Sequence, residues 1–203
     1  QYVERMQPRL EAHIRLSTPV REVRRTAKGV TIGLDTGTEE FDAVILACHS
    51  DTALQLLADP SAAESEILGA LPYVDNDVVL HTDASILPQR RRAWASWNYR
   101  LHADPAHPAT LSYHMNRLQG IQAPVEFCVS LNTGGRVAQE HILGEYVYAH
   151  PVYTPASDAA RARRAEINGQ RQTWYCGAYW YNGFHEDGAR SALEVTQALG
   201  GGW

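Results

Sequence analysis

The spacing of apolar residues divides the chain into segments typical of helices and of strands. Tyr2, Met6 and Leu10 fall on one helical stripe, so we predict a helix at the start of the chain. Residues 20–25 alternate apolar and charged side chains, and residues 30–34 alternate in the same way after a glycine-containing turn. We expect these two segments to pair as neighbouring strands.

Two further segments are short and almost wholly apolar. Residues 43–47 form a continuous apolar run, which is typical of a fully buried parallel strand. A helix is expected directly after this run, with Ser50 or Asp51 as its N-cap. Residues 173–176 read as another strand, and a helix follows over residues 187–199. Because ligands in open α/β sheets bind at the carboxyl ends of such strands, both strand ends are candidate sites.

The loop between this last strand and the last helix carries aromatic residues and glycines, from Gly177 to Gly188. Glycines let the backbone approach a ligand closely, and the N–H groups and dipole of a helix start favour negative charge. We interpret the loop as an anion and cofactor cradle. The alternative is an ordinary strand–turn–helix whose aromatic residues pack in the core.

The middle of the chain changes from mixed elements to strands. Residues 61–71 predict a helix, and another helix is expected over residues 156–167. Between them, short apolar segments alternate with loops that contain Pro and Gly, which favours an antiparallel sheet. The predicted strands are residues 78–81, 95–99, 111–115, 127–131 and 146–149.

Composition and charge exclude several classes of function. The net charge of −5 over 203 residues argues against nucleic acid or an anionic membrane as the main partner. No apolar run reaches the length of a membrane-spanning helix, so we expect neither an integral membrane segment nor a signal peptide. The three cysteines and nine histidines show no metal-ligand spacing, so we expect no metal site. Reduced, buried thiols are typical of a cytoplasmic protein.

The first residues have the character of a helix that is already under way. Gln1 is not an initiator residue. We therefore expect this sequence to be a piece of a longer chain.

Three stretches resemble the flavin-containing amine oxidase superfamily. They are Thr18-Pro19-Val20-Arg21-Glu22-Val23 with Gly29-Val30, then Phe41 to Ala47, and the terminal strand, glycine and helix from Tyr175 to Gly188. The sequence is also similar to those of bacterial predicted NAD/FAD-binding proteins that are often encoded beside cyclopropane fatty-acid synthases. That similarity is carried by His49-Ser50-Asp51, Leu80-His81-Thr82-Asp83, Trp94 to Tyr99, His150-Pro151-Val152-Tyr153 and Gly183 to Gly188.

The sequence departs from the superfamily in two places. It contains no GxGxxG, the element with which these proteins grip the FAD pyrophosphate. Many relatives also carry an acidic residue near Gly177-Ala178 that bonds the ribityl chain, and this sequence does not. The chain therefore resembles the later part of such a protein, and we expect it to bind FAD weakly or not at all by itself.

The resemblance assigns cofactor contacts to ten residues. It implies that Val20 contacts the adenine end of FAD through its backbone, although a simple core valine is the alternative. Backbone N–H groups at the start of the last helix would face the flavin ring, while N-capping is the other interpretation of the two carboxylates there. Phe184, with Trp180 and Tyr181, would wall the flavin or pack under the loop. The implied cofactor-binding residues are Val20, Ala47, Cys48, Gly177, Ala178, Phe184, His185, Glu186, Asp187 and Gly188.

Two other functions remain open: a substrate pocket in the middle strands and a hydrolase triad after the first parallel strand. His81, Trp97 and Tyr113 could line a substrate pocket, although strands more often use such residues for packing. His49, Ser50 and Asp51 are the side chains of a hydrolase triad, but adjacency in sequence does not give triad geometry, and no GxSxG is present. Their catalytic roles stay unassigned.

The sequence thus predicts an α/β fold with a partial, Rossmann-like FAD-binding domain. Residues 1–60 and 153–203 are expected to form this domain, and residues 61–152 an inserted antiparallel-sheet α+β substrate domain. The predicted function is FAD-dependent oxidation, with hydride transfer from a small-molecule or lipid substrate, as part of a longer chain. The resemblance also implies association with a cyclopropane fatty-acid synthase. The alternative is a non-catalytic lipid- or partner-binding domain.

Overall fold

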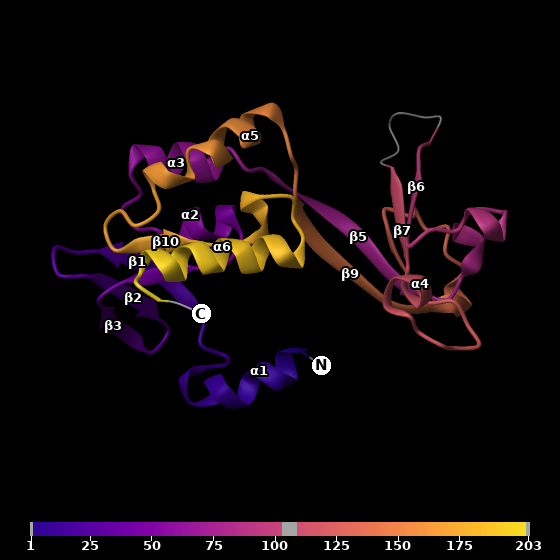
Figure 1. Ribbon diagram of the computed structural model, residues 1–203, viewed down its shortest axis with the longest axis horizontal. Helices are drawn as coiled ribbons and strands as arrows, with labels where there is room; N and C mark the ends of the chain where they lie inside the picture. Colours follow the sequence, from indigo (N-terminus) through magenta and orange to yellow (C-terminus); the bar gives the residue numbers. More distant parts are fainter. Residues whose placement is uncertain (1, 103–108, 202–203) are drawn as a thin grey trace. The chain divides into compact units, whose positions relative to one another are not determined.

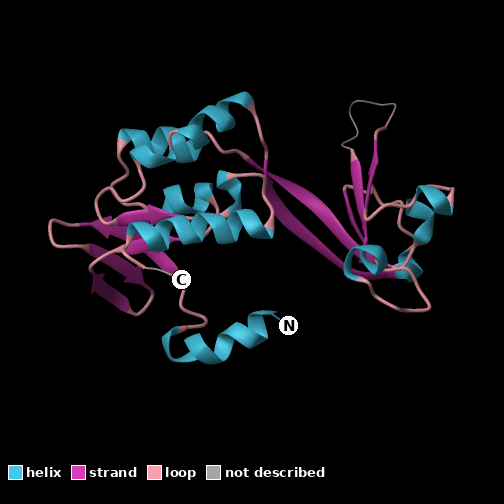
Figure 2. Ribbon diagram, in the orientation of Figure 1, coloured by secondary structure: helices cyan, strands magenta, loops and turns pink. Residues whose placement is uncertain are grey.

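The computed structural model describes residues 2–102 and 109–201, which separate into two compact units. Unit 1 combines Gln1–Pro72 with Pro151–Trp203, and unit 2 is the contiguous segment Tyr73–His150. The helix that follows residue 60 packs within unit 1, so the first division falls after Pro72 instead of at residue 60. Figure 2 shows helices and strands in both units, so the α/β fold class is confirmed.

The first sheet of unit 1 is an antiparallel meander. It consists of β1 (Val20–Arg25), β2 (Val30–Leu34) and β3 (Gly37–Phe41). The alternating pattern predicts the first two strands correctly, whereas β3 has no such alternation and was not expected. At the β1–β2 turn Gly29 has a φ of +155°, and an added Cβ would lie 2.3 Å from the Phe41 carbonyl oxygen. Glycine is therefore required there.

The second sheet of unit 1 joins two segments that are far apart in sequence. The strand β4 (Val44–Leu46) pairs in parallel with β10 (Thr173–Tyr175), with Leu46 opposite Tyr175. Both of these residues are buried, but Ile45 is 43% exposed. The expectation of a fully buried strand is therefore wrong for Ile45, because successive side chains of a strand point to opposite faces and Ile45 faces the groove that it lines with Val20.

Five α-helices lie in the described residues of unit 1, and their starts show how the sequence specifies them. Ser61 caps α3 by accepting a hydrogen bond from the Glu64 N–H at 3.2 Å, and Thr154 caps α5 in the same way. His49 occupies the N-cap of α2 and its side chain makes no capping hydrogen bond, so the expectation of Ser50 or Asp51 as N-cap is wrong. The helices are α1 (Tyr2–Leu10), α2 (Ser50–Leu56), α3 (Ala62–Gly69), α5 (Pro155–Ala162) and α6 (His185–Ala198).

Side chains from both segments of unit 1 form one hydrophobic core. Val23, Ile67 and Leu68 come from the first segment and are fully buried, and Tyr175 from the second segment joins them. Figure 1 shows α3 and α5, one from each segment, side by side. The second segment is thus an integral part of unit 1. On α1, by contrast, Met6 is exposed, and the side chain of Tyr2, expected on the same stripe, lies outside the described residues.

Unit 2 is built on a five-stranded sheet in the order β6-β7-β8-β5-β9. The pairs β5–β8, β6–β7 and β7–β8 are antiparallel, as the strand spacing predicts. One short helix, α4 (Met115–Gln119), follows β7. The strands are β5 (Tyr73–His81), β6 (Trp97–Arg100), β7 (Thr110–His114), β8 (Cys128–Leu131) and β9 (Ile142–Pro151).

Helices long and apolar enough to cross a lipid bilayer are absent from residues 2–102 and 109–201.

Candidate functional site

The carboxyl ends of β4 and β10 lie side by side in unit 1. The pairing continues past the strands, since the Cys176 N–H donates to the Leu46 carbonyl oxygen at 3.0 Å. Ala47 and Cys48 therefore follow one strand where Cys176 and Gly177 follow the other. Burial raises the pKa of the Cys48 and Cys176 thiols, so both are neutral at physiological pH. The two strand ends proposed as sites are thus brought together.

The loop after β10 is fastened directly to the last helix. The Gly177 N–H donates to the Ser191 hydroxyl at 2.8 Å, and that hydroxyl donates to the Gly188 carbonyl oxygen at 2.9 Å. A Cβ on Gly177 would lie 2.4 Å from the ring of Tyr179. The chain's own packing therefore explains why residue 177 is glycine.

Gly188 is different, because nothing in this chain crowds it. A Cβ added there would meet Ala178 at 3.9 Å, which is an ordinary van der Waals contact. Glycine within a helix is less favourable than alanine by about 1 kcal/mol. The space beside Gly188 and Ala178 is therefore compatible with another bound group, as the cofactor interpretation of this loop requires.

The acidic residues at the start of α6 differ in their surroundings. One oxygen of Asp187 accepts from the Phe184 N–H at 2.9 Å and from the Asn182 N–H at 3.2 Å. Asp187 therefore acts as a cap for the loop, which is one of its two predicted roles. Phe184, His185 and Glu186 expose their side chains, and Phe184 is 49% exposed. These three side chains are accessible to a ligand.

The aromatic residues of the loop divide between core and surface. Trp180 is 4% exposed and packs in the core of unit 1, with the Arg164 guanidinium 5.3 Å from its ring centre. The Tyr181 hydroxyl donates to Glu194 at 2.5 Å. Trp180 thus has the packing role that was the alternative to a flavin wall.

Val20 lines a groove next to the open side of β4. The groove has a volume of about 390 Å³, and its walls include Leu34, Phe41 and Ile45. Val20 is 38% exposed, so it is not a simple core valine. At the rim, Arg15 donates to both carboxylate oxygens of Glu39, at 2.6 and 2.7 Å. An apolar floor with a charged rim suits a flat heteroaromatic ring.

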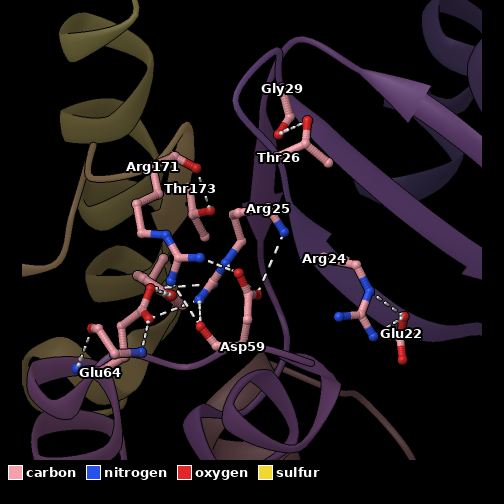
Figure 3. Close-up of polar contacts among 11 residues, drawn as sticks. Glu22, Arg24, Arg25, Thr26, Gly29, Asp59, Glu64, Arg171 and Thr173 are labelled. Carbon is pink, nitrogen blue, oxygen red and sulfur yellow. Dashed lines mark hydrogen bonds and ion pairs between the residues drawn. The ribbon is translucent and has the colours of Figure 1, made fainter.

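A buried charge network holds the β10 strand against the first sheet (Figure 3). Arg25 forms an ion pair with Glu64 at 2.9 Å, and both side chains are at most 2% exposed. The Tyr175 hydroxyl donates to Glu64 at 2.6 Å, while Arg171 and Arg25 both donate to the Asp59 carbonyl oxygen. Burial alone would raise the pKa of Glu64, but its hydrogen bonds and Arg25 hold that pKa below its ordinary value.

The sequence analysis missed this network, although two signals for it exist. Arg25 lies two residues after Val23 on β1, and alternation along a strand places both side chains on the same face. Ser61 and Glu64 have the spacing of a capping box, which fixes Glu64 at the start of α3.

In unit 2, the structure separates His81 from Trp97 and Tyr113. His81 is fully buried, its Nε2 lies 2.9 Å from the Ser130 hydroxyl, and its Nδ1 accepts from the Asp83 N–H at 3.1 Å. Burial lowers the pKa of His81. Both ring nitrogens are thus engaged inside the unit, which does not support a place for His81 in a substrate pocket. Trp97 and Tyr113 are cross-strand neighbours, with ring centres 5.6 Å apart.

Within residues 2–102 and 109–201, no three His, Cys, Asp or Glu side chains are grouped so that they could hold a metal ion.

Comparison with a known protein family agrees with the cofactor interpretation of this site. Residues 1–90 match the model of the family described as flavin containing amine oxidoreductase. No curated protein matches the sequence.

Solved structures share the fold at low sequence identity. Putrescine oxidase bound to putrescine has a TM-score of 0.64 at 13% identity, with 97% of this chain and 51% of that chain covered. A CLA-producing fatty acid isomerase from P. acnes has a TM-score of 0.57 at 14% identity, covering 90% and 47%. Cyclohexylamine oxidase from Brevibacterium oxydans has a TM-score of 0.56 at 10% identity, covering 89% and 47%.

The chain thus has the mixed α/β fold of flavin amine oxidase-like proteins. It spans about half the length of these solved structures.

Proposed function

We propose that this chain is part of an FAD-dependent oxidoreductase, with unit 1 contributing to the FAD site and unit 2 to substrate binding. The observation that carries the proposal is the open space at Gly188 and Ala178, beside the adjoining ends of two parallel strands. The family match over residues 1–90 and the shared fold support it.

The residues of unit 1 have distinct roles in this proposal. The groove at Val20 receives the adenine end of FAD, and the backbone of Ala47 and Cys48 approaches the cofactor. Backbone N–H groups of Glu186, Asp187 and Gly188 at the start of α6 favour negative charge on the flavin ring. When bound, FAD supplies the hydride-accepting chemistry, and the chain supplies orientation and electrostatics.

One experiment tests both whether the chain binds FAD and whether the loop from Gly177 to Gly188 lies at the cofactor. Saturation-transfer NMR with the 203-residue chain and FAD detects weak complexes, and weak binding is expected because the chain has no GxGxxG. Gly188→Ala should reduce the saturation transfer to FAD, since the new methyl group fills the space in which we place the cofactor. Gly69→Ala is the matched control, because a Cβ there also meets only an ordinary contact, Leu54 at 3.7 Å.

One result would contradict the proposal: saturation transfer to FAD that is equal in the wild-type, Gly188→Ala and Gly69→Ala chains. Both substitutions replace a helical glycine, so any general effect of added helix stability is common to them.

A non-catalytic lipid- or partner-binding domain is the alternative function, and the exposed apolar residues of α1 favour it. Val3 is 59% and Met6 is 55% exposed. Association with a cyclopropane fatty-acid synthase and a cytoplasmic location remain predictions of the sequence resemblance. Co-purification with that synthase, in a strain that carries both genes, tests the association, and flavin reduction by a substrate separates an enzyme from a binding domain.

A further inference from the structure

The sheet of unit 2 has the reverse of the usual distribution of polar and apolar side chains. Along β7 and β8 every second residue is buried, and the buried residues are the polar ones or cysteine. The residues between them are apolar or aromatic, and all of them are half-buried. Because side chains alternate between the two faces of a strand, this sheet has a polar covered face and an apolar open face.

The covered face is held by its own hydrogen bonds. Ser112 and Ser130 are cross-strand neighbours, and the Ser130 hydroxyl donates to the Ser112 hydroxyl at 2.7 Å. His81 adds the contact to Ser130 described above. Ile86 and Val137 pack against Val79 on the adjoining strand. The hydroxyl groups of Ser112 and Ser130 are thus satisfied within unit 2 and need no ligand.

The open face is formed by six cross-strand neighbours on β6, β7 and β8. Trp97 is 47% exposed and Tyr99 is 68% exposed, at positions opposite Tyr113 and Leu111. Burial raises the pKa of the Tyr113 hydroxyl, so this hydroxyl is neutral at physiological pH. We call this set the apolar sheet face: Trp97, Tyr99, Leu111, Tyr113, Val129 and Leu131.

We propose that the apolar sheet face binds an uncharged hydrocarbon chain, such as the acyl chain of a lipid substrate. The inference rests on the proposed function, because it names the substrate class that unit 2 takes. Three strands about 4.8 Å apart give the face a width of about 10 Å, which is long enough to receive a stretch of an acyl chain. Removing such a chain and these side chains from water together is the driving force.

The chemistry of the face favours a hydrocarbon over an amine. An ammonium group needs a carboxylate or converging aromatic ring faces, and the six side chains include no carboxylate. The rings of Trp97 and Tyr113 meet edge to face, at an interplanar angle of 76°, so they do not form two walls of a cation cage. Leu111, Val129 and Leu131 offer only aliphatic contacts.

The test uses the 203-residue chain and the fluorescent polyene cis-parinaric acid, which emits more strongly in apolar surroundings. We expect saturable binding that oleyl alcohol displaces, because displacement by an uncharged chain shows that the hydrocarbon part is recognised. Putrescine should not displace it. The measurement needs no flavin, so its result is independent of whether the proposed FAD site is correct.

Three variants locate the binding. Trp97→Glu and Tyr99→Glu put a charge on the apolar sheet face at exposed positions that the fold tolerates, and each should weaken parinaric acid binding at least tenfold. Val125→Glu is the control, because Val125 is 43% exposed in a loop and belongs to neither sheet face. The affinity of Val125→Glu for parinaric acid should equal that of the wild type. Circular dichroism melting of each variant identifies any loss of folding.

Several outcomes would overturn the inference. They are no saturable binding, displacement by putrescine instead of oleyl alcohol, or unchanged affinity in folded Trp97→Glu and Tyr99→Glu. A wild-type dimer that becomes a monomer in both variants, measured by light scattering, would assign the face to a second copy of the chain instead.

Discussion

Glu64 provides the sharpest test of how unit 1 is held together. Its carboxylate accepts from Arg25, from the Tyr175 hydroxyl at 2.6 Å and from the Ser61 N–H at 2.7 Å, and its exposure is 1%. Glu64→Gln keeps the shape but removes the charge, so the buried Arg25 loses its main counter-charge. Breaking a buried ion pair costs about 3–5 kcal/mol. We expect a loss near the lower limit, about 3 kcal/mol, because the Gln oxygen still accepts a hydrogen bond.

Glu66→Gln is the matched control on the same helix. Glu66 pairs with Arg163 at 2.8 Å, but the two side chains are 66% and 37% exposed, so solvent screens the pair. The assay is urea denaturation followed by circular dichroism, which reports mainly on unit 1 because five helices lie there. Equal midpoints for Glu64→Gln and Glu66→Gln would refute a stabilising role for the buried network.

The pH dependence gives this reasoning a second readout. The pKa of Glu64 is lower in the folded protein than its ordinary value. Its contribution to folding is therefore fully present above the pKa of the unfolded chain, about 4.3, and is lost as the pH falls through the folded value. The difference in stability between wild type and Glu64→Gln should be constant near pH 7 and should narrow below about pH 4. A difference that stays constant down to pH 3 would contradict this.

Three further predictions follow from local contacts. Asp187→Ala removes the acceptor of two backbone N–H groups and should lower the stability of unit 1 by about 1 kcal/mol in thermal melts, with no change if the cap is unimportant. Cys128 is fully buried with a pKa of about 11, so DTNB at pH 8 should label the half-buried Cys48 first, and the reverse order by mass spectrometry would contradict the fold of unit 2. Gly29→Ala should destabilise more than Gly37→Ala by roughly 1–3 kcal/mol in urea, because only the former meets a backbone oxygen at 2.3 Å; equal losses would argue against that turn.

Most of the elements could be predicted because their patterns are local. The alternation in β1 and β2, the apolar runs at β4 and β10 and the helical spacing of α6 each identify the element from one stretch of sequence. The strand β3 could not be predicted in this way. It exposes most of its residues and carries two glutamates, so it has no apolar face to mark it.

The candidate site was only partly predictable for a different physical reason. The loop from Gly177 to Gly188 is marked by its own glycines, but its contact with the end of β4 depends on pairing between distant segments. The two faces of the unit 2 sheet likewise depend on register. His81, Trp97 and Tyr113 are all ring-bearing residues on predicted strands, and only the strand pairing places His81 on the covered face.

The two-segment construction of unit 1 has a consequence for synthesis on the ribosome. Glu64 and Arg25 emerge early and can meet, but Tyr175 is made only after the whole of unit 2. During that interval β4 lacks β10, its partner among the described residues, and Leu46 has no Tyr175 against which to pack. Unit 2 is contiguous and can fold in the meantime, so the nascent chain carries one complete unit and one that still lacks its second segment. A circular permutant that begins at residue 151 would bring the two segments of unit 1 together in translation and remove the wait.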